Sequence, residues 1–151
     1  MSLEQNGIQC MLRSLINFTI TGIPKPLKRH RSTKFGHMYD PSSKDKKDIW
    51  LQIAKHRPKQ PFPGTIYLKL IFHMPRPKHH FKTKAGKPTD IVKEKYASIK
   101  LHSYKPDLDN LVKMIADIIQ PQMICDDSQI CWLSAVKQYG DPKTEVIIEE
   151  I

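Results

Sequence analysis

The sequence predicts a single α+β domain in which a mixed sheet of about four strands packs with two or three helices. Two patterns support this fold class. Several segments alternate apolar and polar residues, as half-buried strands do, and another repeats apolar residues at helical spacing. The chain has 151 residues and is 39% hydrophobic, which suits one modest core. We expect residues 15–151 to form this domain and residues 1–14 to be an N-terminal tail, whose opening Met-Ser-Leu we interpret as a cloning remnant.

Four segments have the pattern expected of strands. Residues 15–23 place isoleucine and phenylalanine on one face and reach a glycine and a proline at their end. Residues 65–74 alternate in the same way. Residues 130–139 and 144–151 are expected to be two further strands, because a Gly-Asp-Pro turn joins them.

Two segments are expected to be helices. The first is capped by Ser42 or Ser43 and extends to residue 56, with its inward face formed by Ile49, Ile53 and Trp50. The second, residues 108–120, carries a clear apolar stripe and is ended by Pro121. Residues 24–41 and 75–89 have no period and much charge or proline, which predicts loops. Residues 90–100 are expected to be a short helix or a partly ordered segment.

Charge is the most informative feature of the composition. Residues 1–105 hold 22 basic and 6 acidic side chains, whereas residues 106–151 hold 3 basic and 9 acidic ones. Two stretches without acidic residues favour nucleic acid as the partner, over the simpler explanations of solubility or a flexible basic loop. Neither stretch resembles an amphipathic membrane helix. The predicted DNA-binding residues are Lys25, Lys28, Arg29, Arg31 and Lys34 in the first stretch, and Arg76, Lys78, Lys82, Lys84 and Lys87 in the second.

Several classes of protein are disfavoured. No apolar run reaches the roughly 18–20 residues that a membrane-spanning helix needs, and no secretory signal is evident. Three cysteines, an odd number without a CxxC pair, argue against a disulfide scaffold or zinc finger and for a reducing cytoplasm. We expect Cys125, Cys131 and Trp132 to fill the core, and His79 and His80 to belong to the basic loop rather than to a zinc site.

Acidic residues on either side of the second helix are the candidate chemistry. Asp107 and Asp109 come just before its apolar stripe, and Pro106 favours an extended chain there. In an extended chain, residues two apart project to the same side, so this pair can share a metal at a strand-to-helix junction. Asp126 and Asp127 follow the helix. Oxygen ligands of this kind suit Mg²⁺ or Mn²⁺.

Simpler interpretations of these residues stay open. An aspartate before a helix is most often an N-cap, and Asp-Asp-Ser is a plausible turn. Lys113 lies four residues from both Asp109 and Asp117, as a surface ion pair would. Spacing alone leaves open whether the second acidic pair meets the first. The basic remainder of the chain favours the metal site, because a bare carboxylate cluster would repel phosphates.

The motif Asp-Leu-Asp-Asn-Leu-x-Lys, a helix, and then Asp-Asp-x-Gln resembles the RusA family of Holliday-junction resolvases. The likeness is strongest over residues 105–137. The first strand and loop are also similar, with Phe-Thr-Ile-x-Gly-x-Pro-x-Pro at residues 18–26, so the resemblance extends over about residues 16–150.

The resemblance implies a homodimeric, Mg²⁺-dependent endonuclease, with Mn²⁺ as a substitute metal and no small organic cofactor. RusA-like proteins, often carried by phages and prophages, cut four-way DNA by paired symmetric nicks that leave 5′-phosphate and 3′-hydroxyl ends. Asp107, Asp109 and Asp127 would be the catalytic, metal-binding carboxylates and Lys113 the catalytic lysine, while the role of Asp126 as a ligand stays open.

Two alternatives accompany this expectation. One is a branched-DNA-binding module of the same ancestry that does not cut, and the other is a nuclease acting on flaps or forks. The basic loop around residues 78–95 is longer than the resemblance implies, and it bears on substrate preference.

Overall fold

The structure, a computed structural model, describes residues 14–151, so that residues 1–13 of the expected tail lie outside the described residues. Eight strands are present in this part: β1 (Leu15–Thr21), β2 (Arg31–Ser32), β3 (Met38–Tyr39), β4 (Ile66–Met74), β5 (Phe81–Lys84), β6 (Lys87–Val92), β7 (Ile130–Tyr139) and β8 (Lys143–Glu150). The α-helices are α1 (Ser43–Ile53), α2 (Glu94–Ala97) and α3 (Leu108–Ile119). Three short 3-10 helices are η1 (Ala54–His56), η2 (Lys78–His80) and η3 (Asp127–Gln129).

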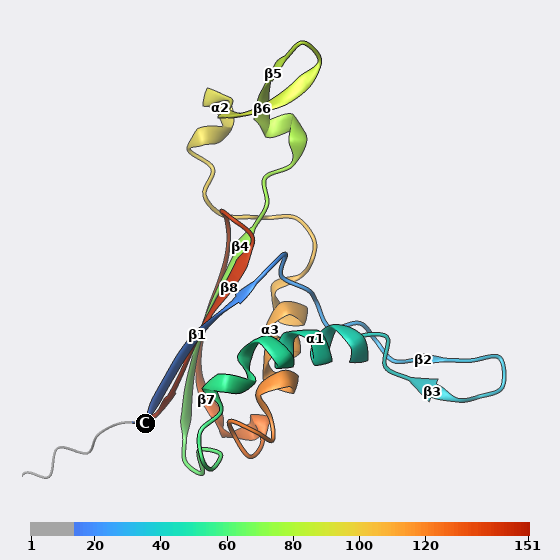
Figure 1. Cartoon of the computed structure of the whole chain (residues 1–151), viewed down its shortest axis with the longest axis vertical. Helices are drawn as coiled ribbons and strands as arrows, with labels where there is room; N and C mark the ends of the chain where they lie inside the picture. Colours follow the sequence, from blue (N-terminus) through green and yellow to red (C-terminus); the bar gives the residue numbers. More distant parts are fainter. Residues whose placement is uncertain (1–13) are drawn as a thin grey trace, which may run out of the picture.

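The centre of the molecule is a four-stranded mixed sheet with the order β1-β8-β4-β7 (Figure 1). The β1–β8 and β8–β4 pairs are antiparallel, whereas β4 and β7 run parallel. Helices α1 and α3 pack against the sheet, and the predicted α+β fold class is confirmed. The four predicted main strands and both long helices are all present, with ends within two residues of those expected apart from the continuation of α1 as η1.

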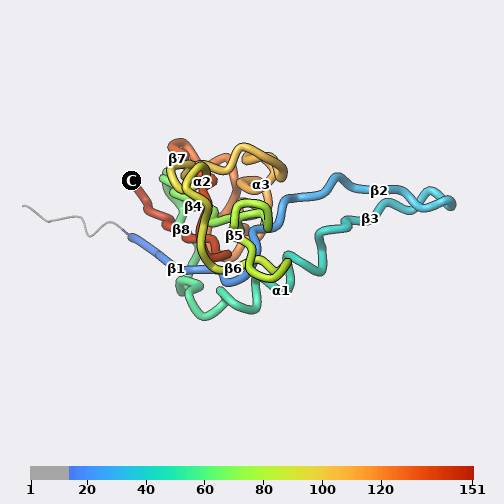
Figure 2. The backbone as a smooth tube through the Cα atoms, turned by 90° about the horizontal axis from the view of Figure 1, so that it is seen from above, coloured from blue at the N-terminus to red at the C-terminus, as the bar shows by residue number. Residues whose placement is uncertain are grey.

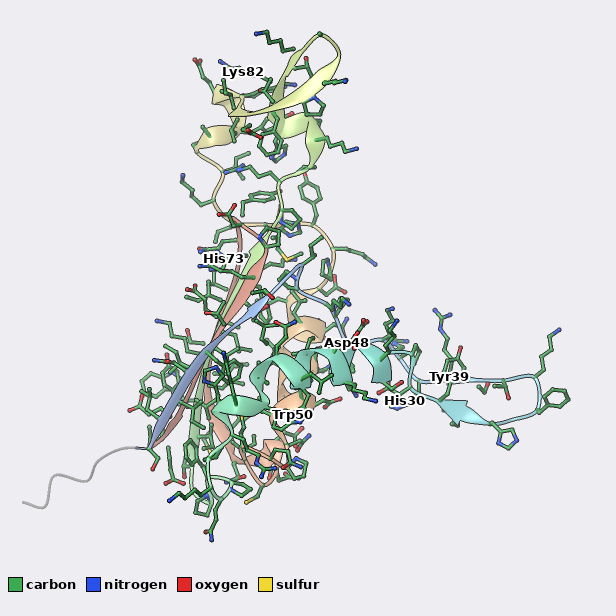
Figure 3. The ribbon with its side chains drawn as sticks, viewed as in Figure 1. His30, Tyr39, Asp48, Trp50, His73 and Lys82 are labelled. Carbon is green, nitrogen blue, oxygen red and sulfur yellow. The ribbon has the colours of Figure 1, made fainter. Side chains whose placement is uncertain are left out.

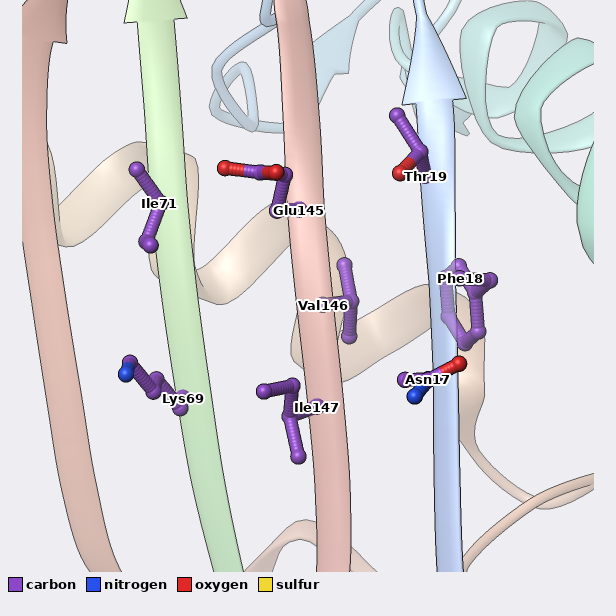
Figure 4. A pocket seen from close by; sticks show the side chains of 8 residues that line it. All are labelled: Asn17, Phe18, Thr19, Lys69, Ile71, Glu145, Val146 and Ile147. Atoms are coloured by element: carbon purple, nitrogen blue, oxygen red, sulfur yellow. The ribbon is translucent and has the colours of Figure 1, made fainter.

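The alternation in the strands decides which sheet face is covered. Along β4, every second residue from Ile66 to Met74 is buried. Phe18 and Ile20 of β1 and Val146 and Ile148 of β8 are buried with them. Helix α3 contributes its stripe to the same core, and α1 contributes Ile49 and Ile53. Trp50 is only partly buried, but it packs against this core. The opposite sheet face is open, and its polar and apolar side chains line a depression (Figure 4).

The first predicted loop is an arm that projects from the body. We call residues 24–41 the arm; they contain the short antiparallel hairpin of β2 and β3, which extends far from the sheet (Figure 2). The arm is anchored at its root, where the buried Ser42 accepts a 2.9 Å hydrogen bond from the Lys28 N–H. Ser42 is the N-cap residue of α1, but its hydroxyl bonds to the arm and makes no capping hydrogen bond to the helix.

The prediction of a loop at residues 75–89 is wrong. These residues form η2 and the β5–β6 hairpin, which together with α2 make a lobe, residues 76–99, beyond one end of the sheet (Figure 1). The hairpin turns at Ala85 and Gly86, whose φ angles of 51° and 74° are both positive. A two-residue type I′ turn requires positive φ at both positions, so this Ala-Gly pair explains the tight connection.

The predicted burial of three residues near β7 is also wrong. Cys125 and Cys131 are exposed, and 60% of Trp132 is exposed. The reason is topological for two of them, because Cys131 and Trp132 lie at the beginning of β7, an edge strand whose first residues are exposed. Cys125 lies in the segment between α3 and η3. Among residues 14–151, no helix has the length and apolar content needed to cross a membrane.

Candidate functional site

Asp107 and Asp109 lie at the N-terminal end of α3, where they line one pocket of about 360 Å³ together with Asn110 and Lys113. Asp107 is the N-cap residue and is extended, with φ −69° and ψ 140°. Its carbonyl accepts the Leu111 N–H, but its carboxylate makes no capping hydrogen bond. Both carboxylates are exposed, so they are available to a ligand.

The arm supplies the other wall of this pocket. Lys28, Arg29 and His30 line it opposite the two carboxylates. A 2.9 Å hydrogen bond from the Leu27 N–H to the Asn110 carbonyl ties the arm to the first turn of α3. Residues about 80 positions apart in the sequence are therefore held around one opening that carries both acidic and basic groups.

Lys113 points back along α3 to Asp109, with its Nζ 3.3 Å from a carboxylate oxygen. Both side chains are well exposed, so this ion pair contributes at most about 1 kcal/mol to stability. The other candidate partner, Asp117, instead pairs with Lys46 of α1 at 3.0 Å. The Lys113 ammonium thus stays beside the pocket and is only weakly held.

Lys137 of β7 positions the chain that leads into Asp107. Its ammonium donates to the carbonyls of Tyr104 and Pro106, the second at 2.5 Å. Backbone hydrogen bonds from Tyr139 to Lys100 and from His102 to Lys137 fix the same segment along the edge of β7. Nothing in the sequence singled out Lys137, because its partners are carbonyl groups rather than side chains.

The second acidic pair lies at the opposite end of α3. The Asp127 N–H donates to the side chain of Gln120, the residue that follows the helix, at 2.9 Å. Twelve helical residues separate the two ends of α3, and at 1.5 Å each they span about 18 Å. The structure therefore brings Asp107, Asp109 and Lys113 together but not Asp126 or Asp127. Within residues 14–151, no three His, Cys, Asp or Glu side chains are grouped so as to hold a metal.

Asp126 has a structural partner and Asp127 is exposed beside it. The Asp126 carboxylate accepts the Ser128 N–H at 2.9 Å, and hydrogen bonding by Ser128 holds the pKa of Asp126 below its usual value. Gln129 completes a capping box by accepting the N–H groups of Cys125 and Asp126. Asp-x-x-Gln is the sequence signal for this box.

Gln129 also anchors the acidic turn to the body of the protein. Its amide nitrogen donates to the carbonyls of Phe62 and Gly64, both at 2.8 Å. One side chain thus holds four backbone groups from two separate segments. The position of Asp127 depends on this residue, which lies in the Asp-Asp-x-Gln motif but was given no role from the sequence.

The predicted DNA-binding residues divide between the arm and the lobe. Lys25 forms a 2.6 Å ion pair with Asp45. Among the predicted residues, the other exposed cations of the arm are Lys28, Arg29, Arg31 and Lys34, and those of the lobe are Lys78, Lys82, Lys84 and Lys87. Figure 3 shows Lys82 on the lobe and His30 on the arm, on two separate projections of the molecule.

Arg76 instead holds the lobe to the sheet. Its guanidinium donates to the carbonyls of Tyr96 and Ile99 and lies 4.7 Å from the centre of the Tyr139 ring. His80 stacks on Tyr96 with ring centres 4.0 Å apart, and burial lowers its pKa. His80 is therefore part of a packed aromatic joint rather than of a basic loop.

An apolar patch adjoins the carboxylates on the outer side of α3. Leu108, Val112, Leu133 and Ala135 line an open hollow with Asp109 and Lys113. The exposed Trp132 lies on the other face of the same edge strand, where its ring packs 4.6 Å from that of Tyr67. A surface of this kind is typical of a place where another macromolecule binds.

Comparison with known proteins identifies the family. A family model described as endodeoxyribonuclease RusA matches residues 20–149. A protein of Lactococcus phage r1t named crossover junction endodeoxyribonuclease rusA is 30% identical over 115 residues, or 74% of each chain. The uncharacterized protein YqaN of Bacillus subtilis (strain 168) is 31% identical over 142 residues, which cover 90% of this chain and 96% of YqaN. With most of its length matched, the chain belongs to the RusA family of endodeoxyribonucleases.

Proposed function

We propose that this protein is a Mg²⁺-dependent endonuclease that resolves four-way DNA junctions by paired symmetric nicks. One observation carries the proposal: two carboxylates that take no part in helix capping share a pocket with cations of the arm. The cations attract a phosphodiester into the pocket. The carboxylates offer the oxygen ligands that Mg²⁺ or Mn²⁺ prefers.

Each group of the pocket has a separate role in this proposal. Asp107 and Asp109 would hold the metal, and their exposed carboxylates fit a hard cation. When bound, the metal supplies a Lewis acid that activates water and offsets phosphate charge. Lys113 holds the scissile phosphate and stabilises the charge that builds up on it during attack. Lys28 and Arg29 orient the strand through its backbone, so that water attacks the phosphorus in line with the P–O3′ bond. Breaking that bond leaves a 5′-phosphate and a 3′-hydroxyl.

A second copy of the chain would complete the site. Asp127 is the third expected carboxylate, but α3 separates it from Asp107 and Asp109 by about 18 Å. A dimer in which Asp127 of one chain meets the first pair of the other would supply three carboxylates at each site. The apolar patch beside Asp109 supports such an interface. A two-fold dimer also matches the near two-fold symmetry of a four-way junction.

The test is a cleavage assay on a labelled four-way junction and a matched linear duplex, in Mg²⁺ or EDTA. We expect symmetric, Mg²⁺-dependent nicks in the junction alone. Asp109→Asn should bind the junction but not cut it, because a neutral amide is a poor metal ligand. Asp48→Asn, an exposed acid of α1 outside the pocket, is the matched control and should cut normally.

Two outcomes would overturn the proposal. Unchanged cutting by Asp109→Asn would remove the pocket from the reaction. Tight junction binding by the unaltered protein, with no cut in Mg²⁺ or Mn²⁺, would favour a branched-DNA-binding module. Cutting of flaps or forks in preference to junctions would keep the chemistry and change the substrate.

A further inference from the structure

We propose that the tip of the arm is a base-stacking wedge, in which Phe35 packs against DNA bases at the branch point. The inference rests on the proposed function, since it takes branched DNA as the substrate. It adds a contact to bases, whereas the pocket and the basic residues account only for contacts to phosphates.

Phe35 is the most exposed large apolar side chain among the described residues, with 90% of its surface open. It lies in the turn between β2 and β3, and this hairpin projects away from the sheet (Figure 2). Met38 on the same hairpin is also exposed. Phe35 therefore has no packing role in the core of this chain. Proteins that bend or open DNA often insert an apolar side chain of this kind between bases.

The turn that presents Phe35 is defined by hydrogen bonds. The Gly36 N–H donates to the Thr33 carbonyl at 3.0 Å, and the Thr33 N–H donates to the His37 carbonyl at 2.9 Å. The Thr33 hydroxyl accepts the His37 N–H at 3.2 Å. Gly36 has φ +80°, which a side chain would disfavour. The ring is thus held at the tip by a formed turn.

The charge around the ring selects a polyanion as the partner. Arg31 and Lys34 precede Phe35 on the hairpin, and no acidic residue occurs between positions 24 and 39. The first acid of the arm, Asp40, is already paired with Lys46 at 2.7 Å. Cations beside an exposed ring are the combination that proteins use to bind DNA with stacked bases, because the cations contact the backbone and the ring contacts the base.

The position of the arm relates the wedge to the cut. The root of the arm lines the carboxylate pocket through Lys28, Arg29 and His30. Phe35 is five positions after His30, a reach of at most about 16 Å in an extended chain. This distance corresponds to about five nucleotides along one strand of duplex DNA. A base pair at the branch point is stacked on one side only, so a wedge there disrupts less stacking than it would in intact duplex.

The test uses a junction with 2-aminopurine at the branch point, a base whose fluorescence rises when it leaves its stack. The protein is titrated in EDTA, so that no cutting occurs. We expect a rise in fluorescence with the unaltered protein, and its loss with Phe35→Ala. That variant should bind the junction about ten-fold more weakly and duplex DNA equally well. Phe35→Trp should keep the rise, because a larger ring also stacks. Lys34→Ala is the matched control and should weaken junction and duplex binding alike.

The results separate the wedge from the proposed function. If Phe35→Ala keeps both the fluorescence rise and the preference for junctions, the wedge is wrong even though the unaltered protein cuts. If Phe35→Ala instead changes the sedimentation mass of the free protein, the tip contacts a second copy of the chain and the wedge is equally wrong. Failure of the unaltered protein to cut any branched DNA would overturn the proposed function separately, because stacking is measured without metal.

Discussion

Two inactive variants are expected to restore cutting when they are mixed. The variants are Asp109→Asn and Asp127→Asn, which alter opposite ends of α3. If each site takes Asp109 from one chain and Asp127 from the other, a mixed dimer has one site with both substitutions and one site with neither. If one chain forms the whole site, every site in the mixed dimer carries a substitution.

The size of the recovery follows from this arrangement. Random exchange of subunits makes about half of the dimers mixed, and each mixed dimer has one intact site of two. About a quarter of all sites are then active. Since the intact site is always alone in its dimer, the products should be single nicks in place of paired cuts.

A supercoiled plasmid with an extruded cruciform distinguishes these products. Paired cuts linearise the plasmid, whereas a single nick gives an open circle. Asp107→Asn mixed with Asp109→Asn is the control; it should stay inactive, because both substitutions lie at the same end of α3. Absence of nicking in the Asp109→Asn and Asp127→Asn mixture, with subunit exchange verified by native mass spectrometry, would refute the shared site.

Three further predictions concern stability and DNA affinity. Gln129→Leu should lower the free energy of unfolding by about 2–4 kcal/mol, since four backbone groups lose their hydrogen-bond partner. A loss under about 1 kcal/mol, measured by urea unfolding, would contradict the anchoring role of Gln129. Burial, with nearby cations, lowers the pKa of His80 below 6.5, so the unfolded chain binds more protons and stability should fall as pH drops below about 6.5. His80→Phe should flatten this dependence of stability on pH, measured by thermal melts between pH 5 and 8. An unchanged slope would show that His80 is not its source. The double variant Lys82→Ala, Lys84→Ala should lower the slope of log affinity against log salt by about two; an unchanged slope would show that the lobe does not contact phosphates.

The spacing of apolar residues and the positions of proline and glycine were enough to predict the central fold. Strand β4 buries alternate residues because one sheet face packs against helices, and the same alternation is visible in the sequence. The end of α3 was equally predictable, since Pro121 follows its last turn. The lobe was missed because Ala85-Gly86 is a weaker hairpin signal than Asn-Gly, although the backbone takes the same positive φ angles.

The candidate site was predictable in its parts but not in its assembly. The sequence indicates that Asp107 and Asp109 precede a helix, but the pocket also needs Lys28 and Arg29, which reach it through the Leu27–Asn110 backbone bond. Trp132 was wrongly expected in the core because apolar character alone does not distinguish a buried strand from an edge strand.

The lobe leaves the sheet and returns to it at the same end. The chain departs after Met74, and Leu101 pairs with Gln138 on its return, next to the 3.0 Å bond between Gly140 and Met74. The lobe is thus an insertion whose two ends are both held at the same end of the sheet. One continuous piece of the gene encodes it, so that a recombination event could exchange the whole lobe while the register of β4 with β7 and the carboxylate pocket stay as they are. A lineage could in this way replace the lobe and its lysines without rebuilding the carboxylate pocket.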